Sequence, residues 1–158
     1  MSDKPSFVPY LVVSNAPAAI DFYKKAFGAV ELVRHMVPNS DKVMHSHLVI
    51  EGSDVMLSDD CSSFMGTKSE TPEALGGSPV TFHLHTDDAN ALWAKAVAAG
   101  ATEKMPLMDQ FWGDRYGQLR DPFGHYWSIG QTISKPTEAE IEEGAKKSFD
   151  RAKEVFAD

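Results

Sequence analysis

Two pairs of histidines are the first residues in this 158-residue chain whose type and spacing could do chemistry. His45 and His47 stand two residues apart, and His83 and His85 repeat that spacing later in the chain. Alternate residues of a strand point to one face of a sheet, so each pair would present both imidazoles on the same side of a strand. Neutral imidazole is a ligand for Zn, Fe, Ni and Cu, so the two pairs could converge on one divalent metal ion. Inward-facing histidines also serve as hydrogen-bonded pocket residues, and both interpretations stay open.

A second group of candidate binding residues lies between positions 110 and 117, where the sequence is Gln-Phe-Trp-Gly-Asp-Arg-Tyr-Gly. Trp112 offers a flat apolar wall, and Arg115 can hold a carboxylate or phosphate through two parallel hydrogen bonds. Aromatic walls with a few polar groups are typical of small-molecule pockets. A loop anchored by buried aromatics, with a surface pair between Asp114 and Arg115, would have the same composition, so this alternative also stays open.

Several common catalytic motifs do not occur in the sequence. It contains no Gly-x-Gly-x-x-Gly dinucleotide motif, no Gly-Lys-Ser/Thr phosphate loop and no Gly-x-Ser-x-Gly nucleophile elbow. Cys61 is the one cysteine, and it follows Asp59 and Asp60, whose negative charges disfavour a thiolate. A nucleotide-binding enzyme or a serine or cysteine hydrolase is therefore not expected.

The elements that must position these residues are predicted to occur twice in the same order. Apolar runs, helix caps and glycine stops predict strand, helix and three strands in each half. In the first half the expected elements are a strand over 7–13, a helix from 16 to its stop at Gly28, and strands near 30–37, 44–50 and 55–58. In the second half they are a strand over 79–86, a helix ending at Gly100, and strands near 102–107, 116–120 and 125–129.

Two further segments lie outside this repeat. Residues 60–78 are rich in Ser, Thr, Gly and Pro and are expected to form a connector, either a plain linker or a lid. Residues 135–157 are expected to form a C-terminal helix that opens with a capping box from Thr137 to Glu140. Its apolar stripe consists of Ile141, Ala145, Phe149, Ala152 and Phe156.

Composition limits the classes of partner. The net charge of −8 and the pI near 5.2 argue against nucleic acid or an anionic membrane as a partner, because both favour basic surfaces. No apolar run approaches the roughly 20 residues that cross a bilayer. A single cysteine and an N-terminus without a signal-peptide pattern predict a cytoplasmic, one-domain protein.

Four segments together resemble a known family. They are the run from Asn15 to Gly28, the Val-Met-Leu-Ser-Asp that begins at Val55, the 110–117 segment, and the Asp-Pro-Phe-Gly-His-x-Trp from Asp121 to Trp127. These are similar to the vicinal-oxygen-chelate superfamily, the glyoxalase/bleomycin resistance protein/dihydroxybiphenyl dioxygenase group, and to its PhnB-like branch. The resemblance covers about residues 5–132, as two modules of about 5–59 and 79–132. It implies an α+β fold of two βαβββ modules whose mixed sheet curls around a cleft, in a homodimer.

In the superfamily's metalloenzymes, the metal ligands come from the first and last strands of each module. Carried onto this chain, those positions fall on Val8, Met56, Thr81 and Ser128, none of which suits a divalent metal ion. We therefore expect no metal cofactor at the usual centre. A shift of two residues would bring His83 into one position and Tyr10 into another.

The resemblance leaves two kinds of function open, together with a third in which the dimer is only a scaffold. The favoured expectation is a protein that binds a small organic molecule without a metal, as resistance relatives sequester drugs. The residues expected to line its cleft are Tyr10, His47, Met56, Thr81, His83, Trp112, Arg115 and Ser128. The alternative is a glyoxalase-type lyase, isomerase or dioxygenase with one divalent metal held by His45, His47, His83 and His85; no catalytic residue is assigned.

Overall fold

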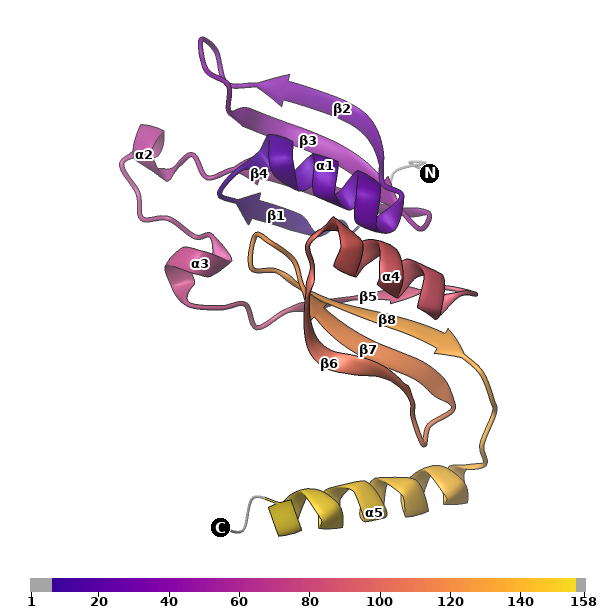
Figure 1. Cartoon of the computed structure of the whole chain (residues 1–158). Helices are drawn as coiled ribbons and strands as arrows, with labels where there is room; N and C mark the ends of the chain where they lie inside the picture. Colours follow the sequence, from indigo (N-terminus) through magenta and orange to yellow (C-terminus); the bar gives the residue numbers. More distant parts are fainter. Residues whose placement is uncertain (1–6, 156–158) are drawn as a thin grey trace.

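The chain folds into two modules of the expected βαβββ order, followed by a separate C-terminal helix (Figure 1). The computed structural model describes residues 7–155. The expectations for residues 5 and 6 and for residues 156 and 157, including Phe156, lie outside this range. None of the helices described here combines the length and apolar character that crossing a bilayer requires.

The first module contains one helix and one four-stranded sheet. Its elements are β1 (Tyr10–Val13), α1 (Ala16–Phe27), β2 (Val30–Met36), β3 (Val43–Ile50) and β4 (Ser53–Asp59). The predicted signals for α1 are confirmed: the Asn15 side chain accepts from the amide of Ala18, and Gly28 ends the helix in a left-handed conformation. The sheet order is β1-β4-β3-β2, with a parallel β1–β4 pair and antiparallel neighbours otherwise.

The second module repeats this arrangement. Its elements are β5 (Thr81–His85), α4 (Ala89–Ala99), β6 (Thr102–Asp109), β7 (Asp114–Arg120) and β8 (Tyr126–Thr132), in the sheet order β5-β8-β7-β6. The equivalence extends to detail at the start of each helix. The amide of Ala16 donates to Asp59 at the end of β4, and the amide of Ala89 donates to Gln131 in β8. In each module, a side chain of the last strand therefore caps the N-terminus of that module's helix.

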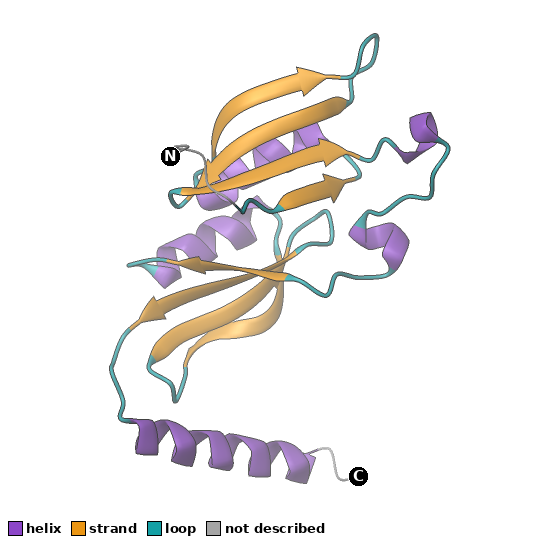
Figure 2. Ribbon diagram, turned by 180° about the vertical axis from the view of Figure 1, so that it is seen from behind, coloured by secondary structure: helices purple, strands orange, loops and turns teal. Residues whose placement is uncertain are grey.

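Each sheet has one face packed against helices and one face free of them, and we call the second the open face. In β3, Ser46, Leu48 and Ile50 are buried beneath α1, whereas His45 and His47 stand on the open face. Seen from behind, the strands of both sheets lie in front of α1 and α4, so the two open faces turn to the same side (Figure 2).

The modules are joined through their helices and one turn. Helices α1 and α4 pack together, and the rings of Tyr23 and Phe27 lie 5.4 and 4.8 Å from that of Trp127. His125, in the turn before β8, places Nε2 3.1 Å from the backbone oxygen of Val12. The fold thus has the predicted α+β class, with two separately hydrogen-bonded mixed sheets.

The connector contains two short helices, α2 (Ser62–Met65) and α3 (Pro72–Leu75). Its second half is held in place, because Ser14 donates to Glu73 and Pro72 packs against Gly124 of the second module. The C-terminal helix, α5, spans Glu138–Val155. Its capping box is confirmed: the amide of Thr137 donates to Glu140, and the amide of Glu140 donates to the Thr137 hydroxyl.

Candidate functional site

One row of side chains crosses the open face of the first sheet. Tyr10, Met56, His47 and Val33 are consecutive cross-strand neighbours on β1, β4, β3 and β2. The Tyr10 hydroxyl lies 3.1 Å from Nδ1 of His45, which belongs to the same face. Sequence reasoning predicted three members of this row, and the structure brings them together because the strand register aligns them.

His47 is held by a carboxylate that sequence reasoning did not find. Its Nε2 contacts the Asp54 side chain, and both residues are about three-quarters covered. An acidic partner fixes the orientation of an imidazole and leaves its other nitrogen for a ligand. Strand parity could have found Asp54, because it stands two residues before Met56 and shares its face.

The open face of the second sheet carries a similar arrangement around His83. Nδ1 of His83 lies 2.9 Å from the hydroxyl oxygen of Ser128, its cross-strand neighbour. The ring stacks on Tyr116 at 6.0 Å, and it occupies the space where a side chain on Gly130 would lie. An added Cβ at Gly130 would be 2.7 Å from the imidazole, so this glycine makes room for the ring. Thr81 is exposed on the same strand, two residues before His83.

The two predicted residues of the 110–117 segment have different surroundings. Trp112 packs edge-on against Tyr116 at 5.6 Å and so lies beside the His83 cluster. Arg115 precedes Tyr116 in β7 and therefore points to the opposite face of the sheet. There its guanidinium is bound to Asp109 at 2.7 Å. This hydrogen bond lowers the pKa of Asp109 and raises that of Arg115.

A pocket of about 360 Å³ lies between the two modules. The first module contributes the β3–β4 turn and Asp54, and the second contributes β5 with His83 and the buried ring of Trp127. The pocket thus touches both fixed imidazoles, one directly and one through its carboxylate partner. Its full lining is Phe7, Pro9, Ile50, Gly52, Ser53, Asp54, Val55, Phe82, His83, Leu84 and Trp127.

The positions equivalent to superfamily metal ligands do not offer a suitable donor set. In the register of the sheets, Met56 is paired with Tyr10 and Ser128 with His83, whereas Val8 precedes β1. These pairs offer the phenol of Tyr10, the thioether of Met56, the hydroxyl of Ser128 and the imidazole of His83. Together they are a poor set of ligands for a divalent cation. Within residues 7–155, no three His, Cys, Asp or Glu side chains are grouped closely enough to hold a metal ion. The described residues therefore do not fit the superfamily's metal, and the four-histidine alternative stays a prediction.

Comparisons with known proteins agree with this fold. Residues 6–129 match the model of the glyoxalase/bleomycin resistance protein/dioxygenase superfamily. An uncharacterized protein of Mycobacterium tuberculosis, Rv0887c, is 51% identical over 140 residues, which cover 88% of this chain and 81% of that protein. The crystal structure of an Arabidopsis thaliana gene product, At5g48480, is 36% identical, with a TM-score of 0.62 over 80% of this chain and 98% of that one.

A more distant structure extends the likeness of fold to a protein of the PhnB type. It is the putative 3-demethylubiquinone-9 3-methyltransferase, PhnB protein, of Bacillus cereus, 15% identical with a TM-score of 0.61 over 80% of this chain and 99% of that one. The family match spans both modules and ends before α5 begins. The chain therefore belongs to the glyoxalase/bleomycin resistance protein/dioxygenase superfamily.

Proposed function

We propose that this protein binds a small organic molecule in the pocket between its modules, without the superfamily's metal ion. The observation that carries the proposal is the pocket of about 360 Å³ that combines the rings of Phe82 and Trp127 with the polar groups of His83 and Asp54. Pockets for small molecules typically have volumes of about 300–1,000 Å³, with apolar walls and a few placed polar groups.

The polar groups of this pocket are held in place before any ligand arrives. His83 is fixed by Ser128 on one side and by the stacked ring of Tyr116 on another. Asp54 is fixed by His47. Side chains that are already ordered lose little conformational entropy on binding, which favours affinity. The ligand class that suits this lining has an apolar ring and a group that exchanges hydrogen bonds with an imidazole.

The setting proposed for this activity is a cytoplasmic homodimer. Cys61 is a free thiol, as expected in a reducing compartment, and the net charge of −8 does not favour nucleic acid. A second copy would cover the open faces, which carry Tyr10 and Met56 in the first module and His83 and Tyr116 in the second.

A fragment screen tests the proposal. Ligand-observed NMR on the purified chain should identify small ring compounds, and calorimetry should give their dissociation constants. We expect His83→Ala to weaken a pocket ligand by about tenfold, because it removes both a wall and a hydrogen-bonding group. His35→Ala is the matched control, since His35 is an exposed histidine on β2, the strand at the far edge of the first sheet. Compounds that bind wild type and His83→Ala equally would show that this pocket is not the site.

A further inference from the structure

We propose that His35 and His45 together hold a divalent ion of the later first-row transition metals, such as Cu²⁺, Ni²⁺ or Zn²⁺, on the open face of the first sheet. These two residues are called the β2–β3 histidine pair here. The pair lies outside the positions of the superfamily's metal ligands, and it shares only His45 with the four-histidine alternative. Neither residue lines the pocket between the modules, so this site is separate from the proposed ligand site.

The two histidines are direct neighbours on adjacent strands. His35 of β2 is the cross-strand partner of His45 of β3 in an antiparallel pair, so both side chains stand on the same face. Their ring centroids are 6.2 Å apart, and the ring planes differ by 18°. Two imidazoles that bind one ion through bonds of about 2.0–2.1 Å have ring centres roughly 4.5–6.5 Å apart, depending on the angle at the ion. The strand register therefore already places the two rings at a chelating separation.

A tyrosine orients His45 for this role. The hydroxyl of Tyr10 lies 3.1 Å from Nδ1 of His45. When Nδ1 carries the proton and donates it to this hydroxyl, the lone pair of Nε2 is available to an ion. Metal-binding histidines commonly donate their second ring N–H to an oxygen in this way, and the hydrogen bond fixes the ring. Tyr10 is thus a positioning residue and not a ligand.

His35 forms the side of the pair that an ion can reach from solvent. Its side chain is exposed, whereas that of His45 is half-buried. Within residues 7–155, the ring nitrogens of His35 have no hydrogen-bond partner, and its aromatic contact is with His45. An exposed ring can rotate to adjust the angle at the ion, because few neighbours restrict its rotamers.

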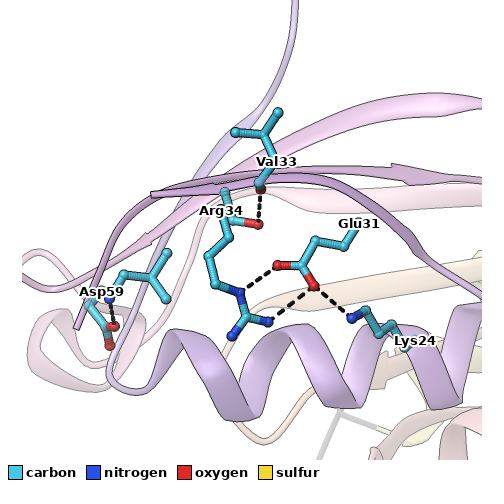
Figure 3. Close-up of polar contacts among 7 residues, drawn as sticks. Lys24, Glu31, Val33, Arg34 and Asp59 are labelled. Carbon is cyan, nitrogen blue, oxygen red and sulfur yellow. Dashed lines mark hydrogen bonds and ion pairs between the residues drawn. The ribbon is translucent and has the colours of Figure 1, made fainter. Parts of the chain in front are cut away.

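The basic residue next to His35 in the sequence is turned away from the pair. Arg34 points to the opposite face of β2, toward α1, where it and Lys24 both bind the carboxylate of Glu31 (Figure 3). On the open face, Asp54 of β4 contributes a negative charge, and the whole chain carries a net charge of −8. A divalent cation that approaches the pair is therefore not repelled by an adjacent guanidinium.

The pair is expected to bind its ion reversibly. Within the part of the chain that the structure describes, no third His, Cys, Asp or Glu side chain joins the two imidazoles, so water would complete the coordination. Dialysis against metal-free buffer would empty such a site, and its affinity is therefore measured by adding the ion. Nitrogen ligands bind Cu²⁺ more tightly than Ni²⁺ or Zn²⁺, whereas Mg²⁺ and Ca²⁺ prefer oxygen and should not bind.

Calorimetric titration of the metal-free chain with Cu²⁺ tests the site. Wild type should bind one equivalent more tightly than any other. His35→Asn and His45→Asn should each weaken that equivalent by about a hundredfold, because a second linked ligand raises the affinity by about 10²–10⁴. Tyr10→Phe should weaken it by about tenfold, since it removes only the hydrogen bond that orients His45. His85→Asn is the matched control, because His85 is an exposed histidine on β5 of the other sheet, and it should bind as wild type does.

Electron paramagnetic resonance of the Cu²⁺ complex gives a second readout, because the coupling to ring nitrogens counts the bound imidazoles. We expect two imidazoles in wild type and in Tyr10→Phe, and one in His35→Asn. Circular dichroism should show the same fold for wild type and His35→Asn, because the His35 side chain is exposed. A wild type that binds no Cu²⁺ would overturn the proposal. An ion that is kept by His35→Asn and lost in His85→Asn would do so as well, and would favour the four-histidine alternative.

Discussion

The hydroxyl of Tyr23 in α1 donates a hydrogen bond of 2.7 Å to Oδ2 of Asp121, which lies 98 residues later in the turn before β8. The same oxygen accepts from the indole of Trp127, and Oδ1 accepts from the amides of Phe123 and His125. The carboxylate is buried, and these four donors satisfy it. One residue therefore fixes the β7–β8 turn and ties it to the helix of the other module.

Removing the phenol oxygen should loosen this junction. Tyr23→Phe keeps the ring but deprives a buried carboxylate of one hydrogen bond, so we expect the free energy of unfolding to fall by about 2 kcal/mol. Urea unfolding followed by circular dichroism measures the change. Tyr126→Phe is the control: among the described residues the contact of Tyr126 is between its ring and the ammonium of Lys104, which a phenylalanine ring preserves, and its hydroxyl makes no hydrogen bond. Equal losses in the two variants would contradict a special role for Tyr23.

The same phenol should make the fold sensitive to alkali. Burial first, and then the charge of Asp121, raises the pKa of Tyr23 well above its usual value. The folded state therefore favours the protonated phenol. Its contribution to stability is complete below about pH 10, the value for an unfolded tyrosine, and is lost as the pH rises toward the folded-state pKa. Above this pH, wild type should lose stability more steeply than Tyr23→Phe; parallel curves for the two would refute the prediction.

Gly130→Ala should disturb the pocket through His83. The new methyl would lie 2.7 Å from Cε1 and 3.0 Å from Nε2 of the imidazole, so the ring must move. We expect a loss of about 1–3 kcal/mol in the free energy of unfolding, together with weaker ligand binding. In a His83→Ala background the space is vacant, and the same substitution should cost much less. If thermal unfolding shows equal losses in both backgrounds, the clash is not the cause.

Metal removal should leave the protein unchanged, because the donors equivalent to superfamily ligands suit no divalent cation. Elemental analysis after dialysis into metal-free buffer should find far less than one equivalent of Zn, Ni, Fe or Mn. A chelator should not lower the melting temperature, because chelation destabilises a protein only when it removes an ion that stabilises the native state. A stoichiometric metal that is lost in both His47→Ala and His83→Ala would instead support the four-histidine enzyme.

Much of this fold could be predicted from the sequence because its signals are local. Asn15 marks a helix start because its side chain caps the first turn, and Gly28 and Gly100 mark helix ends because their backbones adopt the left-handed conformation. Apolar spacing identifies the buried side of each element. Counting alternate residues also placed Tyr10, His47 and Met56 on one face. A shift of two residues preserves strand parity, so parity alone could not choose between Val8 and Tyr10 as the partner of Met56.

The rest of the site depends on contacts between distant segments. The predicted strand began at Tyr116, so Arg115 seemed to lie in a loop, where parity gives no direction. In fact β7 begins at Asp114, and Arg115 is thereby turned away from the His83 cluster. The pocket between the modules exists because Tyr23 meets Asp121 and α1 meets α4. No local pattern encodes that approach.

The contact between Pro72 and Gly124 opposes domain swapping between two copies of the chain. A Cβ on Gly124 would lie 2.7 Å from Pro72, so the connector is pressed onto the turn that Asp121 organises. An exchange of whole modules between copies would require two interactions to break, the Pro72–Gly124 contact and the hydrogen bond from Tyr23 to Asp121. The connector therefore favours pairing of the two modules within one chain over pairing between chains.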